Sequence, residues 1–146
     1  MRLTKDQIDE LGRELDAIRS EVTADLGERD AAHIRRMVRI ARGSAVTGRA
    51  LLMFGLDPIT WMLGIGALAT AKILENMEIG HNVMHGQYDW MNDPALASAT
   101  YEWDNVCDGG HWRRYHNYEH HTFTNILGRD RDVGYGVMRV SSEQYW

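Results

Sequence analysis

The stretch that decides the fold is Ala50–Leu74, ALLMFGLDPITWMLGIGALATAKIL, the most apolar part of a chain of 146 residues. Two apolar segments, 50–56 and 59–74, flank the dipeptide Asp57-Pro58, and Lys72 is the one charged side chain of the second segment. Because proline cannot continue a helix, this dipeptide predicts a tight reversal between two helices. Neither segment reaches the ~20 apolar residues of a typical membrane span. Hydropathy alone therefore fits a buried helical hairpin in a soluble protein as well as a membrane hairpin.

Upstream of this stretch, residues 1–42 are expected to form two charged helices. Thr4 and Gln7 fit a capping box, and an apolar stripe at alternating spacings of three and four follows at Ile8, Leu11, Leu15, Ile18 and Val22. Gly27 breaks this pattern, and a second, arginine-rich helix is predicted from about Asp30 to Arg42. Arginines immediately before an apolar segment are typical of a cytoplasmic membrane interface.

The composition excludes several classes of protein. Hydrophobic residues make up 44% and charged residues 25%, and mean hydropathy is −0.43, which excludes a disordered tail and a densely apolar transporter. A net charge of −5 argues against a nucleic-acid partner. Cys107 is the single cysteine, so a disulfide scaffold and cysteine-based zinc or iron–sulfur sites are excluded.

Histidine is unusually concentrated, since six of the seven lie between positions 81 and 121. The first cluster, His81-Asn82-Val83-Met84-His85, follows the apolar segment, and a spacing of four places both imidazoles on one helix face. The second cluster, residues 116–121 (HNYEHH), repeats that spacing in His116 and His120, while His121 is expected to point about 100° away. Two such clusters predict a histidine-rich metal site for one or two ions.

The residue types alone leave the metal open, because imidazole suits zinc, copper, iron and nickel. Asn82 stands where the zinc-protease motif H-E-x-x-H has glutamate. Glu78 and His81 form one Glu-x-x-His element, whereas soluble di-iron bundles use two. His33, on the arginine-rich helix, receives no ligand role. His111 lies near the second cluster but outside its spacing, and its role stays open.

The two clusters with their flanks resemble the first two histidine boxes of the membrane fatty acid desaturases. Residues 75–80 (ENMEIG) and 86–94 (GQYDWMNDP) surround the first box, and residues 116–125 run into 128–135 (GRDRDVGY). These segments are similar to those of bacterial acyl-CoA and acyl-lipid desaturases. The resemblance covers about Leu51 to the C-terminus, and residues 1–50 add little to it.

The resemblance implies an all-α, membrane-associated protein with its metal site on the cytoplasmic side. Residues 1–42 would form the N-terminal amphipathic and basic helices, 43–80 an apolar membrane hairpin, and 81–146 the cytoplasmic histidine-box region. It further implies two iron ions with O2 as co-substrate, held by His81, His85, His116, His120 and His121, with no catalytic residue separate from these ligands. The reaction would insert a double bond into a fatty acyl chain carried by CoA or a lipid. Electrons would come from a ferredoxin or cytochrome b5-type donor and its reductase, and membrane lipid would be a further partner.

Residues near the clusters have two interpretations each. Six acids can accept hydrogen bonds from the outer nitrogens of ligating histidines or cap loops, namely Asp89, Asp93, Glu102, Asp104, Asp130 and Asp132. Trp90, Trp103 and Trp112 can line a substrate path, lie at the membrane interface or pack in the core.

The family carries a third histidine box and further helices in a C-terminal half that this sequence does not contain. The expectation is therefore a fragment that is inactive alone and binds iron weakly or not at all. Desaturation by membranes that contain only this chain would contradict that expectation. Two alternatives stay open: an alkyl or sphingolipid hydroxylase with the same boxes, and a small soluble protein that binds zinc, copper or nickel. Membrane fractionation with metal analysis separates the last of these from the others.

Overall fold

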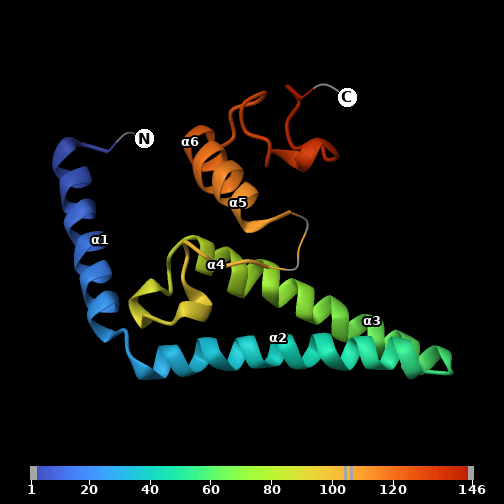
Figure 1. The fold of residues 1–146 in the computed structure, drawn as a ribbon. Coiled ribbons are helices and arrows are strands. Elements are labelled where there is room, and N and C mark those ends of the chain that lie inside the picture. Colours follow the sequence, from blue (N-terminus) through green and yellow to red (C-terminus); the bar gives the residue numbers. More distant parts are fainter. Residues whose placement is uncertain (1–2, 104, 106, 145–146) are drawn as a thin grey trace. The chain divides into compact units, whose positions relative to one another are not determined.

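The computed structural model describes residues 3–103, 105 and 107–144, and these residues form helices without any strand (Figure 1). The all-α prediction is confirmed. The described residues contain six α-helices: α1 (Lys5–Asp25), α2 (Glu28–Phe54), α3 (Pro58–Ile73), α4 (His81–Met84), α5 (Gly109–Trp112) and α6 (His121–Phe123). Two π-helical segments continue them, η1 (Leu74–Gly80) between α3 and α4, and η4 (Arg113–His120) between α5 and α6. Short 3-10 turns lie at η2 (Asp89–Met91), η3 (Pro94–Leu96) and η5 (Gly134–Gly136).

The chain divides into two compact units, Met1–Arg36 and Met37–Trp146, with the boundary inside α2. In the first unit α1 begins at the predicted capping box, in which Thr4 Oγ1 accepts from the Gln7 backbone N–H and Gln7 Oε1 accepts from that of Thr4. The helix ends before Gly27, as predicted. The proposed segments 1–42, 43–80 and 81–146 stay a prediction.

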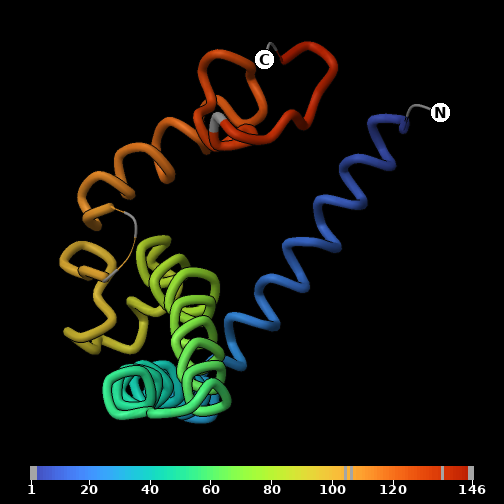
Figure 2. The backbone as a smooth tube through the Cα atoms, turned by 90° about the vertical axis from the view of Figure 1, so that its right-hand side faces the viewer, coloured from blue at the N-terminus to red at the C-terminus, as the bar shows by residue number. Residues whose placement is uncertain are grey.

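The predicted end of the second helix at Arg42 is wrong, because α2 continues to Phe54. No proline interrupts this part of the sequence, and one of its glycines, Gly48, lies at a packing contact between helices. A Cβ atom at Gly48 would lie 2.7 Å from the Leu68 side chain and 2.9 Å from the Gly64 carbonyl oxygen. Glycine at this position therefore lets α3 pack closely on the C-terminal part of α2, and the two helices lie close together near the turn that joins them (Figure 1; Figure 2).

The predicted reversal at Asp57-Pro58 is confirmed. Asp57 caps α3, since its carboxylate accepts hydrogen bonds from the backbone N–H groups of Ile59 (2.9 Å) and Thr60 (3.0 Å). Pro58 occupies the first helical turn, where its missing N–H breaks no helical hydrogen bond. Among the described residues, no helix combines the length and the apolar character needed to cross a membrane.

The best-buried part of the second unit lies where η1 and α4 meet the loop around residue 103. Ile79 is 2% exposed and Val83 is fully buried. Trp103 packs directly on the backbone of Gly80, where a Cβ atom would come within 2.5 Å of the indole ring. This contact fixes the helical segment that ends immediately before the first histidine cluster.

Candidate metal centre

The first histidine cluster lies at the end of the long helical segment formed by α3, η1 and α4. The His81 and His85 rings are 4.7 Å apart between centroids, so the predicted shared face is confirmed. The turn before the cluster is held by side chains, because the Glu78 carbonyl accepts from Asn82 Nδ2 and from the Tyr88 hydroxyl, both at 3.0 Å.

The backbone of the second cluster is largely a π-helix rather than an α-helix. His116 and His120 belong to η4, and His121 begins α6. The prediction that His121 points away is wrong, because its ring lies 5.1 Å from that of His116, nearly as close as the 4.9 Å between His116 and His120. In a π-helix the i→i+5 hydrogen bonds widen the turn, so residues four and five positions after His116 both flank it.

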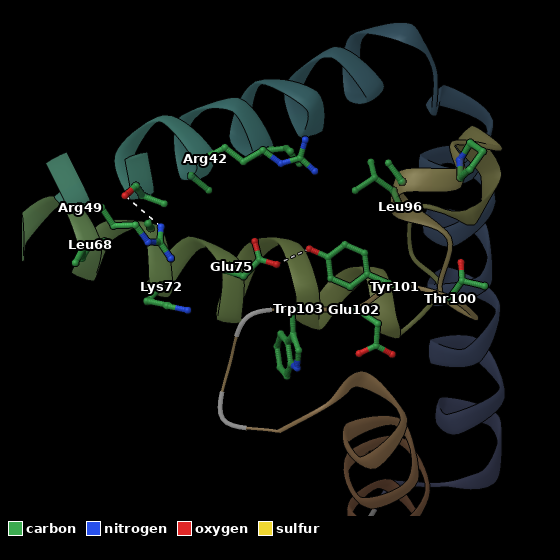
Figure 3. A pocket seen from close by; sticks show the side chains of 16 residues that line it. Arg42, Arg49, Leu68, Lys72, Glu75, Leu96, Thr100, Tyr101, Glu102 and Trp103 are labelled. Carbon is green, nitrogen blue, oxygen red and sulfur yellow. Dashed lines mark hydrogen bonds between the residues drawn. The ribbon is translucent and has the colours of Figure 1, made fainter. Parts of the chain in front are cut away.

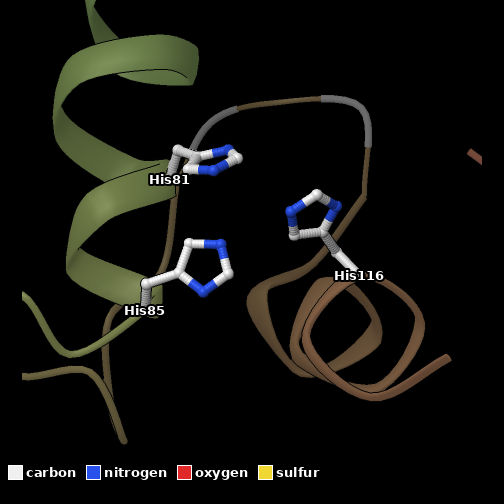
Figure 4. Close-up of side chains that lie close together, drawn as sticks. All are labelled: His81, His85 and His116. Atoms are coloured by element: carbon white, nitrogen blue, oxygen red, sulfur yellow. The ribbon is translucent and has the colours of Figure 1, made fainter. Parts of the chain in front are cut away.

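His81 and His85 of the first cluster lie opposite His116 of the second (Figure 4). The His116 ring lies 4.9 Å from His81 and 5.3 Å from His85, and His121 lies 4.8 Å from His85. One possible ligand atom from each of His81, His85 and His116 lies within 4.8 Å of the others. All five predicted ligands are thus brought together. His33 is exposed on α2, and the exposed His111 packs on Tyr115 at 4.3 Å.

Two carboxylates hold the outer nitrogens of the second cluster. His116 Nδ1 lies 2.6 Å from Asp132 Oδ2, and His120 Nδ1 lies 3.0 Å from both oxygens of Asp130. The Asp130 side chain is fully buried and also accepts from the backbone N–H groups of Asn125 and Asp132. A carboxylate on Nδ1 keeps the proton there and leaves Nε2 available to a metal. Asp132 also lies close enough to His116 and His120 to complete a second group of three possible ligands.

The other proposed acids stabilise loops. Asp89 accepts from the backbone and hydroxyl of Ser98 (2.9 and 2.6 Å), Asp93 accepts from the N–H of Ala95, and Glu102 accepts from that of Gly109. Asp104 lies outside the described residues. The loop-capping interpretation therefore holds for these three, and the histidine-orienting one for Asp130 and Asp132.

An indole ring forms one wall of the cluster. Trp112 stacks on His116 at 4.2 Å and 25°, and its ring lies 5.2 Å from His81. Trp103 is buried, and the centroid of its ring lies 5.5 Å from that of Trp112, whereas Trp90 is 37% exposed. Sequence reasoning missed this wall, although Trp112 precedes His116 by four residues, the spacing that had linked the histidines. It also missed Asn117, whose Nδ2 donates to the Met84 carbonyl at 2.7 Å and joins the two clusters.

Burial favours the neutral form of three of these imidazoles, those of His81, His85 and His116. It lowers the pKa of His81, and it lowers that of His85 to about 4, in both cases with a smaller contribution from neighbouring imidazoles. For His116 burial also lowers the pKa and outweighs the opposing effect of Asp132. Neutral imidazole is the form that binds a metal, so these three rings are in the form that accepts a cation near pH 7. The donor set fits iron and the other transition metals that imidazole prefers.

Comparison with known proteins adds an independent observation. The chain is 54% identical, over 144 residues, to an NADPH-dependent stearoyl-CoA 9-desaturase of Mycobacterium tuberculosis. The aligned residues make up 99% of this chain and 34% of that protein. The chain is homologous to bacterial desaturases. This desaturase homologue is also 37% identical over 87 residues to an sn-1 linoleoyl-lipid 6-desaturase of Synechocystis, covering 57% of this chain and 23% of that protein. A protein of the same name from Arthrospira platensis is 33% identical over 102 residues, covering 66% and 27%.

The desaturase homologue spans about a third of the length of the mycobacterial relatives. No family model matches it, and no solved structure matches at a significant level.

Proposed function

We propose that this desaturase homologue supplies five histidine ligands to a di-iron centre that introduces a double bond into a fatty acyl chain, with O2 as co-substrate. The five are His81, His85, His116, His120 and His121. The observation that carries the proposal is the convergence of both clusters, with carboxylates on the outer nitrogens of His116 and His120. The names of the relatives support the reaction class.

Iron, when bound, would supply the activation of O2 that removes two hydrogens from an unreactive chain. The roles of this chain's own residues follow from their contacts. Asp132 and Asp130 hold protons on the Nδ1 atoms and so aim the Nε2 lone pairs of His116 and His120. Trp112 covers the stacked face of His116 and limits the access of water to it.

For the substrate and the reductants we propose an acyl chain on CoA or lipid, and electrons from NADPH through a reductase and a ferredoxin or cytochrome b5-type donor. The name of the mycobacterial relatives, NADPH-dependent stearoyl-CoA 9-desaturase, supports both the acyl-CoA and the NADPH.

We also propose that the hairpin of α2 and α3 lies in the membrane, with the metal centre on the cytoplasmic side. Large apolar side chains at the hairpin end support this, since Met53, Phe54, Leu56 and Ile59 are 73–101% exposed. Exposed apolar clusters of this kind mark protein or membrane contacts. Labelling of the single Cys107 by a membrane-impermeant maleimide from one side of sealed vesicles tests the orientation.

A chimera tests the function. The segment of the mycobacterial stearoyl-CoA 9-desaturase that aligns with this chain is replaced by the chain, and the chimera is supplied with iron, NADPH, reductase and stearoyl-CoA. Gas chromatography with mass spectrometry should detect monounsaturated product. His116→Ala should abolish it, and Asp89→Asn, which removes an acid that binds Ser98, should retain it.

A chimera that is produced at normal levels and forms no double bond would contradict the proposal, as would full activity of His116→Ala. A hydroxylated product would favour the hydroxylase alternative instead.

A further inference from the structure

Two indole rings lie between the histidine cluster and a cleft of about 500 Å³ beside the helical hairpin. The ring of Trp112 touches three of the five predicted ligands. Its centroid lies 4.2 Å from that of His116, and 5.2 and 5.4 Å from those of His81 and His85. Trp103 follows at 5.5 Å from Trp112 and lines the cleft. The two indoles thus form a continuous aromatic contact from the ligands to the cleft.

A tyrosine in the same cleft has a base placed at its hydroxyl group. Tyr101 precedes Trp103 by two residues, and its hydroxyl donates to Glu75 Oε1 at 2.5 Å (Figure 3). Burial raises the pKa of Tyr101, and the hydrogen bond to Glu75 raises it further. The hydroxyl therefore keeps its proton until the ring is oxidised. A tyrosine gives up an electron readily only when this proton leaves with it, and the Glu75 carboxylate is within reach to take it.

The indole N–H of Trp103 donates to a much weaker acceptor, the Cys107 carbonyl oxygen, at 2.7 Å. A backbone carbonyl is too weak a base to take the proton of an oxidised indole. Oxidised Trp103 therefore stays a radical cation, which is a stronger oxidant than a tyrosyl radical. It draws an electron from Tyr101, so an oxidising equivalent that enters at Trp112 ends on the tyrosine.

We propose that Trp112, Trp103 and Tyr101 form an aromatic relay that carries oxidising equivalents away from the histidine cluster. A one-electron oxidant at the cluster takes an electron from Trp112, Trp112 takes one from Trp103, and Trp103 takes one from Tyr101. The Tyr101 hydroxyl proton passes to Glu75, which leaves a neutral tyrosyl radical and a carboxylic acid. A thiol or ascorbate that enters the cleft restores the tyrosine: it supplies one electron, and Glu75 returns the proton.

The aromatic relay protects the ligands. Indole and phenol rings lose electrons only to strong oxidants, so they suit the outward passage of oxidising equivalents rather than the inward passage of electrons from a reductase. This role rests on the proposed function, because O2 chemistry at the histidines supplies the oxidant. When no acyl chain is bound, the imidazoles are the groups that such an oxidant damages first, and Trp112 lies in contact with three of them.

The first test needs no metal. The full chain is treated with EDTA and labelled at Cys107, its single cysteine, with a maleimide that carries a ruthenium tris(bipyridine) complex. A laser flash with hexaammineruthenium(III) as quencher turns the complex into a one-electron oxidant near Trp103. Transient absorption should record a tryptophan radical cation that is replaced by a tyrosyl radical. In Tyr101→Phe the tyrosyl signal should be lost, and the tryptophan signal should last about tenfold longer or more.

Tyr118→Phe is the matched control, because its ring is 63% exposed, and it should leave both signals unchanged. Glu75→Gln keeps an oxygen that accepts from Tyr101 but removes the base, so tyrosyl formation should slow by about tenfold or more. A role in packing alone would not produce this difference in rate. Identical kinetics in the Tyr101 and Tyr118 variants would overturn the proposal, and so would an unchanged rate in Glu75→Gln.

The second test examines Trp112 in the iron-loaded chain. Samples of equal iron content are treated with hydrogen peroxide, and peptide mass spectrometry measures oxidation of His81 and His116 to 2-oxohistidine. Trp112→Phe keeps an aromatic ring that is far harder to oxidise, so histidine oxidation should rise several-fold. Trp90→Phe, at a ring that is 37% exposed, should leave it unchanged.

Equal histidine oxidation in the Trp112 and Trp90 variants would overturn the protective role. A parent chain that takes up no iron would contradict the proposed function and, with it, that role. The flash experiment contains no metal, so it still decides in that case whether Tyr101 reduces Trp103.

Discussion

The contact between Asp132 and His116 gives the sharpest prediction about the metal centre. The substitution Asp132→Asn keeps the shape of the side chain and an oxygen that can accept from Nδ1, but removes the negative charge 2.6 Å from the ring. Losses of such orienting carboxylates typically weaken metal binding by about 10–100-fold, or about 1.4–2.8 kcal/mol. The side chains of His116 and Asp132 are 15% and 21% exposed. Partial solvent screening therefore places the expected loss near the lower end, about tenfold.

Anaerobic titration with Co(II), in competition with a chromophoric chelator, measures this loss. The affinity of the chain alone is expected to be low, so the quantity that matters is the ratio between variant and parent. Asp89→Asn is the matched control, because Asp89 was an equal candidate from the sequence but binds Ser98. Equal affinities for the Asp132 and Asp89 variants would show that the Asp132 carboxylate does not support metal binding through His116.

Three further predictions concern folding and pH. Gly80→Ala should destabilise the apo chain by about 1–3 kcal/mol in urea unfolding, because the new Cβ would lie 2.5 Å from the Trp103 ring. Gly66→Ala, in open space on α3, should be neutral or slightly stabilising, and equal costs at the two glycines would argue against the packing described. Asn117→Ala should cost about 1–3 kcal/mol, because a buried carbonyl of the first cluster loses its donor; an unchanged urea midpoint would count against that link. Because the pKa of His85 is lowered from 6.5 to about 4, between these pH values the His85 imidazole binds a proton in the unfolded chain but not in the folded chain. Stability should therefore be constant above pH 6.5 and fall toward pH 4, and a flat urea midpoint across that range would contradict the burial of the ring.

Local sequence signals predicted much of the fold. The Thr4 capping box and the Asp57-Pro58 reversal are both present, because each depends on side chains within three residues of the helix end. The end of α2 was predicted twelve residues too early, since Phe54 rather than Arg42 is its last residue. The helix continues past Arg42 because it packs on α3 at Gly48. This contact joins two segments of the chain, so no local sequence pattern predicts it.

The histidine positions were predictable, and their mutual geometry was only partly so. Spacing placed His81 with His85, and His116 with His120, but assumed an α-helix throughout. In the π-helix η4, the residues four and five positions after His116 both lie beside it. The His121 ring is therefore turned back to the cluster. Asp130 and Asp132 were two candidates among six, because the fold of the loop after α6, rather than spacing, brings them to the rings.

The central claim is that both histidine clusters bind one metal centre. X-ray absorption at the metal edge of the iron-loaded chain tests it most directly, with His81→Ala and His121→Ala as variants from the two clusters. If both clusters bind one centre, imidazole nitrogen dominates the metal's coordination shell, and either variant lowers the number of imidazole ligands. A shell of oxygen without imidazole scattering, or a spectrum that neither substitution changes, would contradict it.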